Sequence, residues 1–302
     1  MNTLESLPGI RRDVVLAPFT TYNIGGPADY FLEATTTDQL TQAILVARKA
    51  ALPYFILGAG ANILVSDHGF RGLVIRNRAN GTSIDGDRLT VASGATIADL
   101  IELTARESLS GLEHFTGIPS TVGGAIWQNL HFLAPDRKET LFIGDSLISA
   151  EVLLSDNQVY PVDRDFFQFG YDDSKLHHEE VIVLSVTFQL SPKPEAEIRE
   201  QMKANQEWRN EKQPQLSEYP SCGSVFKKIE GVGAGRLIEH EALMKGVRIG
   251  NVQVSEKHAN YLINLGGGTA TDVKALIDLV HDTVLKKTGH DLQLEISLVG
   301  EW

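Results

Sequence analysis

The chain has 302 residues, of which 42% are hydrophobic and 22% charged, and its formal net charge is -12. These values are typical of a folded globular protein, and the length favours two or three packed units over one. The negative charge argues against a general binder of nucleic acid, whose phosphates are held by clustered Lys and Arg. A small phosphorylated ligand stays possible, because backbone N–H groups hold a phosphate whatever the net charge.

The sequence gives no sign of export or of membrane insertion. The N-terminal segment has no apolar run ahead of a small-residue cleavage site, and no later run reaches the roughly 18 apolar residues of a membrane span. Cys222 is the single cysteine and has no partner for an internal disulfide. We therefore expect a soluble cytoplasmic protein without a membrane partner.

Strand and helix patterns alternate along the first part of the chain. Leu40, Ile44, Leu45 and Ala47 fall on one helical face, and the apolar runs 54–57 and 72–75 have the length of strands. We interpret residues 1–75 as a first unit that begins with a βαβ pattern. Between 76 and 192, short strand patterns surround a helix pattern at 96–109, which predicts a second α+β unit.

A polar segment with two prolines, 191–197, predicts a domain boundary near residue 192. The third unit, 193–302, begins with a solvent-facing helix pattern at 195–213, and Gly289 follows a lysine-rich turn as a helix stop should. Its other predicted elements are helices at 236–243 and 271–289 and strands at 247–255, 260–266 and 292–300.

Two loops of small residues carry the strongest local signal. In the first, Gly58 to Asn62, a strand pattern enters a Gly-Ala-Gly-Ala-Asn turn and leaves into another strand pattern. Such a turn lets successive backbone N–H groups converge on a phosphate, although an ordinary tight loop explains the pattern equally well. The second loop, Thr116 to Ala125, raises the possibility that the pair cradles the two phosphates of a dinucleotide. The alternative is two unrelated turns.

Residues 218–227 form a compact loop in which Ser224 follows Gly223. A serine is a poor acid, so Ser224 would act as a proton donor only to a strongly basic carbanion; the alternative is a Ser/Gly turn. Cys222 fits a small buried residue better than a reactive thiol. Glu295, in a strand pattern, suits catalysis if it points inward and is a solvated residue if it points outward. The histidines have no metal-ligand spacing, so we expect no metal site.

Taken in order, these segments resemble the UDP-N-acetylenolpyruvoylglucosamine reductase (MurB) family over nearly the whole chain. The segments that carry the resemblance are 20–30, 57–75, 117–129, 220–227, 246–264 and 294–300. The short connection after residue 190 is similar to the second subtype of the family, which lacks an extra loop in the substrate domain.

The resemblance implies an α+β fold with two subdomains of the vanillyl-alcohol-oxidase (PCMH-like) FAD-binding type and a C-terminal MurB-type α/β substrate domain. The last strand, at about 291–302, is expected to pack back near the flavin. The implied cofactor is non-covalent FAD, reduced by NADPH. The implied cofactor-binding residues are Gly58, Ala59, Gly60, Ala61, Asn62, Ile63, Ser66, Gly117, Ile118, Pro119, Thr121, Gly123, Gly124, Ala125, Val183 and Arg236.

The implied reaction reduces UDP-N-acetylglucosamine enolpyruvate to UDP-N-acetylmuramate, a peptidoglycan precursor, with hydride from flavin N5 to C3. By the resemblance Ser224 gives a proton to C2, Glu295 is its partner at the substrate carboxylate, and Arg209 lies near the active site. The implied substrate-binding residues are Tyr171, Lys227, His258 and Asn260. We expect a monomer.

The chain departs from the family pattern at several positions. Tyr171-Asp172-Asp173-Ser174 stands where the family has Tyr-Arg-x-Ser. Loss of that arginine would cost roughly 3 kcal/mol of transition-state stabilisation, and a carboxylate in its place would repel the substrate. The alternatives are that Arg209 or Arg164 supplies the missing charge, or that the loop is remodelled. Other departures are Ser120, the segment 129–132 and Lys228-Ile229. A flavoenzyme for another substrate and an inactive FAD or UDP-sugar binding protein therefore stay as alternatives.

Overall fold

The computed structural model describes residues 4, 7–229 and 231–302, and it divides into two compact units that interleave along the sequence. Unit 1 comprises Met1–Ile10, Leu32–Ala59 and Val74–Trp208, and unit 2 comprises Arg11–Phe31, Gly60–Leu73 and Arg209–Trp302. The chain therefore passes between the units within strands β2 (Pro27–Ala34) and β5 (Phe70–Asn77) and within helix α4 (Glu195–Lys212). The predicted boundaries at residues 75 and 192 stay predictions.

A five-stranded antiparallel sheet organises unit 1. Its strand order is β12 (Val159–Asp163), β11 (Leu147–Leu153), β13 (Ile182–Gln189), β7 (Arg88–Ala92) and β6 (Thr82–Asp85). Helix α2 (Ile97–Arg106) begins at Thr96, whose side chain accepts a hydrogen bond from the Asp99 backbone N–H. The strands and the helix predicted between residues 76 and 192 are thus confirmed.

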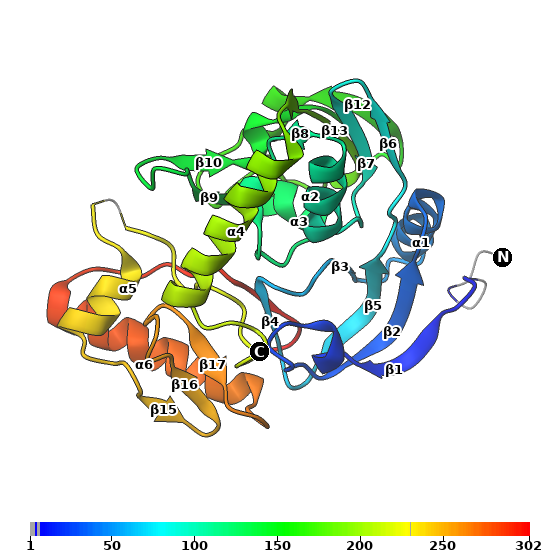
Figure 1. Cartoon of the computed structure of the whole chain (residues 1–302). Helices are drawn as coiled ribbons and strands as arrows, with labels where there is room; N and C mark the ends of the chain where they lie inside the picture. Colours follow the sequence, from blue (N-terminus) through cyan, green and yellow to red (C-terminus); the bar gives the residue numbers. More distant parts are fainter. Residues whose placement is uncertain (1–3, 5–6, 230) are drawn as a thin grey trace. The chain divides into compact units, whose positions relative to one another are not determined.

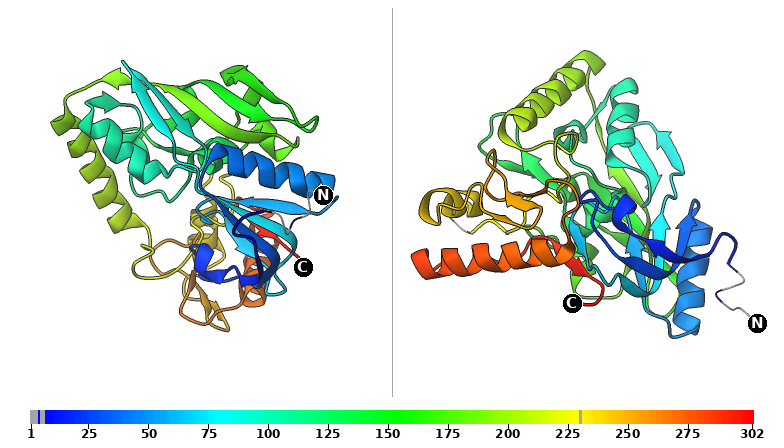
Figure 2. Two further views of the ribbon diagram at one scale, coloured as in Figure 1. Left: turned by 90° about the vertical axis from the view of Figure 1, so that its right-hand side faces the viewer. Right: turned by 90° about the horizontal axis from the view of Figure 1, so that it is seen from below.

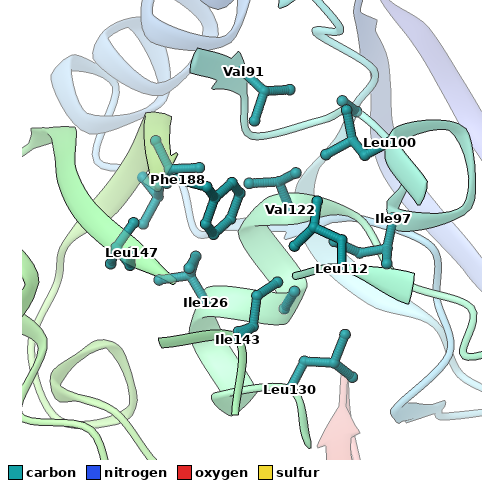
Figure 3. Close-up of a cluster of buried hydrophobic side chains, with 14 of the residues drawn as sticks. Val91, Ile97, Leu100, Leu112, Val122, Ile126, Leu130, Ile143, Leu147 and Phe188 are labelled. Carbon is teal, nitrogen blue, oxygen red and sulfur yellow. The ribbon is translucent and has the colours of Figure 1, made fainter. Parts of the chain in front are cut away.

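The core of unit 1 fills the space between this sheet and helix α3 (Val122–Gln128). Figure 3 shows Phe188 and Leu147 of the sheet beside Val122 and Ile126 of the helix. All four side chains are buried, and each contributes roughly 1.5–3 kcal/mol by leaving water. The helix that follows the second glycine-containing loop is therefore fixed by its apolar face.

The remaining elements of unit 1 are short or peripheral. Helix α1 (Thr37–Lys49) buries one apolar face, and α4 is largely solvent-facing, as predicted, with Ile198 and Asn205 buried. The other strands are β3 (Tyr54–Leu57), β8 (Leu109–Ser110), β9 (His131–Leu133), β10 (Thr140–Phe142) and β14 (Ser191–Pro192).

Unit 2 is built on a small antiparallel sheet and one long helix. The sheet has the order β15 (Arg248–Ile249), β16 (Val252–Val254) and β17 (Leu262–Asn264), and α6 (Ala270–Thr288) packs on β15 and β16 (Figure 1). The right-hand view of Figure 2 shows α6, in orange and red, along its length. Gly289 ends this helix with φ 76°, as predicted.

Further elements complete unit 2. Strand β1 (Arg11–Val15) pairs antiparallel with β2, and a short helix α5 (Ala234–Arg236) leads into a π-helical turn at Leu237–Glu241. Strand β4 (Ile63–Val65) pairs in parallel with β18 (Ser297–Val299). The predicted strand at 292–300 is confirmed over these three residues, and Leu294 adds an isolated bridge to Phe226.

Within the part of the chain that the structure describes, no helix has the length and apolar character needed to cross a bilayer. The same residues contain no group of three or more His, Cys, Asp or Glu side chains arranged to hold a metal ion.

Candidate active site

The first glycine turn, Gly58 to Asn62, connects β3 to β4, so the predicted strand, turn and strand are confirmed. At Gly60, φ is 64° and an added Cβ would lie 2.3 Å from the backbone oxygen of Phe19. At Gly58, an added Cβ would lie 2.5 Å from Thr121 Oγ1. Both positions therefore require glycine, Gly60 for its conformation and both for the close approach of a neighbour.

The second loop lies beside the first one within unit 1. Thr121 contacts Gly58 and caps α3 by accepting a hydrogen bond from the Gly124 N–H. The backbone N–H groups of Val122 and Gly123 donate to the backbone oxygens of Ala95 and Ser93 over 2.9 and 2.7 Å. The two loops are thus neighbours, and the first turn of α3 uses its N–H groups to hold the loop in place.

The backbone N–H groups of the first turn behave differently. Among the described residues, those of Ala59, Gly60, Ala61 and Asn62 donate to no protein acceptor. Consecutive N–H donors in a turn of small side chains are of the kind that binds a phosphate. The residues present therefore fit the diphosphate of a dinucleotide, and the first turn, more than α3, supplies the donors.

Asn62 ties this turn to the C-terminal segment within unit 2. Its side-chain amide donates to the backbone oxygen of Glu295 over 3.1 Å, and its own backbone oxygen accepts from the Ser297 N–H over 3.0 Å. The parallel pairing of β18 with β4 continues this contact. The turn thus positions Glu295, which is half-buried.

The loop that carries Ser224 makes hydrogen bonds with the same C-terminal segment. The residue after it, Val225, accepts a hydrogen bond from the Glu295 N–H over 2.9 Å. Lys227 donates its N–H to the Gln293 oxygen over 2.8 Å. Within unit 2 the structure therefore brings together Asn62, Glu295 and the Ser224 loop, three pieces that are far apart in the sequence.

Buried polar groups surround the Ser224 loop. Burial raises the pKa of the Cys222 thiol to about 12, and Cys222 lies with Tyr22 in the buried core of unit 2. Burial raises the pKa of Tyr261 to about 12 as well, while the negative charge of Glu295 contributes less. Tyr261 also shares a side-chain hydrogen bond with Arg209, whose pKa burial lowers. Cys222 is thus a buried residue, as predicted.

The tyrosines Tyr22 and Tyr261 were not among the residues that the sequence predicted for the site. Tyr261 shares a side-chain hydrogen bond with Arg209, which was predicted for the site, and Tyr22 lies in the buried core of unit 2 with Cys222. The only signal in the sequence is their position inside two of the motifs, 20–30 and 246–264.

Asp172 occupies a closed environment in unit 1. It is 0% exposed, has φ 50°, and its carboxylate lies 3.5 Å from Nδ1 of His131. The rings of His131 and Tyr171 lie 4.6 Å apart, and Tyr171 is 42% exposed. The side chain of Arg164 donates to the Gly144 oxygen and pairs with the Asp145 carboxylate, so it is bound at the surface of unit 1. The departure from the family pattern is therefore a buried Asp–His pair.

The other predicted residues lie at several places. In unit 2, Ser66 donates its N–H to the Val299 oxygen, and Nδ1 of His258 accepts from the Asn260 N–H. Arg236 is exposed on α5, and Val183 is buried in the sheet of unit 1. Ile63 begins β4, while Gly117, Ile118, Pro119 and Ala125 belong to the second loop and the start of α3.

Comparison with known proteins decides the family. Residues 213–299 match the model described as UDP-N-acetylenolpyruvoylglucosamine reductase, C-terminal domain, and residues 28–162 match an FAD binding domain. A UDP-N-acetylenolpyruvoylglucosamine reductase of Clostridium botulinum is 38% identical over 290 residues, with 96% of this chain and 92% of the relative covered. The chain belongs to the UDP-N-acetylenolpyruvoylglucosamine reductase (MurB) family.

Other MurB proteins give the same result. The Moorella thermoacetica reductase is 39% identical over 287 residues, covering 95% of this chain and 92% of the relative. The crystal structure of MurB from Thermus caldophilus matches with a TM-score of 0.79 and 32% identity, covering 96% of this chain and 98% of that one. The predicted fold class, an FAD-binding domain with a C-terminal MurB domain, is confirmed, and so is the assignment to the FAD-dependent reductases.

Proposed function

We propose that the protein reduces UDP-N-acetylglucosamine enolpyruvate to UDP-N-acetylmuramate, a step of peptidoglycan precursor synthesis, with NADPH as the reductant and FAD as the cofactor. Membership of the MurB family supports the substrate and the reaction. The observation that carries the proposal is the turn Gly58 to Asn62, whose free N–H groups suit a diphosphate and whose last residue binds Glu295 beside the Ser224 loop.

The two small-residue loops would hold FAD without a covalent bond. The N–H groups of Ala59 to Asn62 would donate to the diphosphate, and Thr121 would close the turn against the second loop. When bound, FAD would supply the redox chemistry that links NADPH to the enolpyruvyl group. The other cofactor-binding residues given above stay predictions.

Ser224 would complete the reaction by protonating C2 of the substrate. Hydride addition at C3 leaves negative charge at C2 and on the adjoining carboxylate, which makes C2 basic enough to accept a proton from a serine hydroxyl. Glu295, whose backbone is held by Asn62 and Val225, would stand at the substrate carboxylate.

A cation is needed to stabilise the developing enolate, and we assign this role to Arg209. Its contact with Tyr261 places it in the unit that holds Ser224 and Glu295, while Asp172 is buried against His131. A positive charge in such a site is worth roughly 3 kcal/mol in the transition state. Lys227 and His258, both in unit 2, would contribute to the substrate pocket, and the role predicted for Tyr171 in unit 1 stays a prediction.

The remaining expectations also belong to this proposal. Residues 190–194, which include the two-residue strand β14, connect β13 to α4, and this short connection supports the second subtype of the family. We propose a cytoplasmic monomer.

Stopped-flow absorbance on the FAD-loaded protein tests the function. Mixing with NADPH should bleach the flavin band, and adding the enolpyruvyl UDP-sugar should restore it. Bleaching without restoration by this substrate would favour a flavoenzyme of another specificity. A purified protein that binds no FAD would exclude every flavin-dependent function.

A further inference from the structure

Within unit 2, the backbone that follows Ser224 makes hydrogen bonds on two sides. On one side it pairs with the C-terminal segment through the Glu295 N–H and the Gln293 oxygen. On the other side it pairs with a single residue, Asn260, which is 6% exposed. Val225 and Phe226, which make these contacts, are buried.

Asn260 makes the hydrogen bonds that a neighbouring strand would otherwise make with Val225 and Phe226. Its Oδ1 accepts from the Phe226 N–H over 3.0 Å, and its Nδ2 donates to the Phe226 oxygen over 2.8 Å. Its backbone oxygen accepts from the Val225 N–H over 2.9 Å. A side-chain amide carries a donor and an acceptor side by side, so it satisfies both backbone groups of one residue; a carboxylate has no donor.

Asn260 is itself held by its own turn. Its N–H donates to Nδ1 of His258 over 3.2 Å, and the Tyr261 N–H donates to the His258 oxygen over 3.0 Å. Ser255 closes the turn, since its N–H donates to the Tyr261 oxygen and its Oγ accepts from the Lys257 N–H. Hydrogen bonds within residues 255–261 of unit 2 therefore hold Asn260 in place.

We propose that Asn260 is a positioning residue that fixes the Ser224 hydroxyl for proton transfer. This inference rests on the proposed function, and it gives Asn260 a task other than direct contact with the substrate. Ser224 follows Gly223 and precedes Val225 and Phe226, whose backbone groups make these hydrogen bonds. The contacts at Val225 and Phe226 therefore set the direction of the Ser224 side chain. Errors of about 1 Å in such a group lower rates by up to roughly a hundredfold.

The Asn260→Asp variant tests the proposal, because it keeps the shape and removes the donor to the Phe226 oxygen. NADPH should bleach the flavin of this variant at a rate within about twofold of the parent, since Ser224 takes no part in that step. Reoxidation by the enolpyruvyl UDP-sugar should slow by about tenfold or more. Equal slowing of both half-reactions, or of neither, would overturn the proposal.

Two further variants separate positioning from general damage. Asn205→Ala removes another buried asparagine, which binds the His114 oxygen in unit 1, and should lose stability without a selective loss of reoxidation. Asn260→Gln keeps the donor and the acceptor but lengthens the side chain, so it serves if the aspartate variant does not fold. It should also slow reoxidation selectively, and an unchanged rate would contradict the proposal.

A double-mutant cycle gives the final distinction. If Asn260 acts through Ser224, adding Asn260→Asp to Ser224→Ala should change reoxidation by less than about twofold, whereas additive losses would show an independent role. If the parent protein itself is not reoxidised by the enolpyruvyl sugar, the proposed function fails first and this inference fails with it.

Discussion

The side-chain amide of Asn62 donates a hydrogen bond to the backbone oxygen of Glu295, across 233 residues of sequence. Asn62 is the last residue of the first glycine turn, and Glu295 pairs through its N–H with Val225, the residue after Ser224. Two hydrogen bonds, one at the backbone oxygen of Glu295 and one at its N–H, thus connect the turn suited to a diphosphate with the loop that carries the proposed proton donor. The predictions below test the parts of this connection.

Gly60→Ala should abolish FAD binding. The substitution forces a side chain into φ 64° and toward the Phe19 oxygen, at 2.3 Å, so the turn must move. Gly86→Ala is the matched control, because Gly86 has φ 62° with nothing within 4 Å of its added Cβ, and it should cost only about 1 kcal/mol. Flavin absorbance after gel filtration and urea unfolding measure both effects. Full FAD occupancy in Gly60→Ala would contradict the proposed role of the turn.

Asn62→Ala should loosen the C-terminal segment. Loss of the hydrogen bond to Glu295 should lower the free energy of unfolding by about 1 kcal/mol and slow flavin reoxidation more than flavin reduction. Asn80→Ala, on the exposed surface, is the control and should change neither quantity. Urea titration and stopped-flow absorbance provide the two readouts. A reoxidation rate equal to the parent's would show that Glu295 needs no tether.

Asp172→Arg, which restores the residue of the family pattern, should destabilise the protein and leave turnover no faster. Asp172 is fully buried, has φ 50° and lies against His131, so an arginine would be an enclosed cation beside an imidazole. We expect a loss of about 3 kcal/mol in the free energy of unfolding. Asp165→Arg, at an exposed position, should stay within about 0.5 kcal/mol of the parent. Faster turnover in Asp172→Arg would show that the aspartate impairs catalysis.

The free energy of unfolding should fall above pH 9 because the thiol of Cys222 is buried. Folding raises the pKa of Cys222 from 9.0 to about 12, so the folded state holds this proton more tightly. The stabilising contribution is complete below pH 9 and disappears as the pH rises toward about 12, with a slope of at most about 1.4 kcal/mol per pH unit. Cys222→Ala should remove the decline between pH 9 and 10, leaving the later one from Tyr22, Tyr54 and Tyr261, whose pKa values are all raised from 10.0 by burial. Urea titrations at stepped pH measure the slopes, and identical slopes in both proteins would refute the assignment.

Local patterns predicted the elements well because their causes are local. The apolar face of α1, the stop at Gly289 and the strand, turn and strand around Gly58 all follow from residues close in sequence. The contacts of Asn62 with Glu295 and of Asn260 with Phe226 join distant segments, and no spacing in the sequence indicates them. The burial of Asp172 likewise depends on the fold around it, so the departure from the family pattern could be seen in the sequence but its closed environment could not.

The most direct test of the account is a single-turnover measurement on the FAD-loaded Ser224→Ala variant, with the exposed Ser217→Ala variant as a control. After reduction by NADPH, the enolpyruvyl UDP-sugar should reoxidise the flavin of Ser217→Ala at the parent rate and that of Ser224→Ala at least about a hundredfold more slowly. Reoxidation of the Ser224→Ala flavin at the parent rate, with UDP-N-acetylmuramate as the product, would contradict the account.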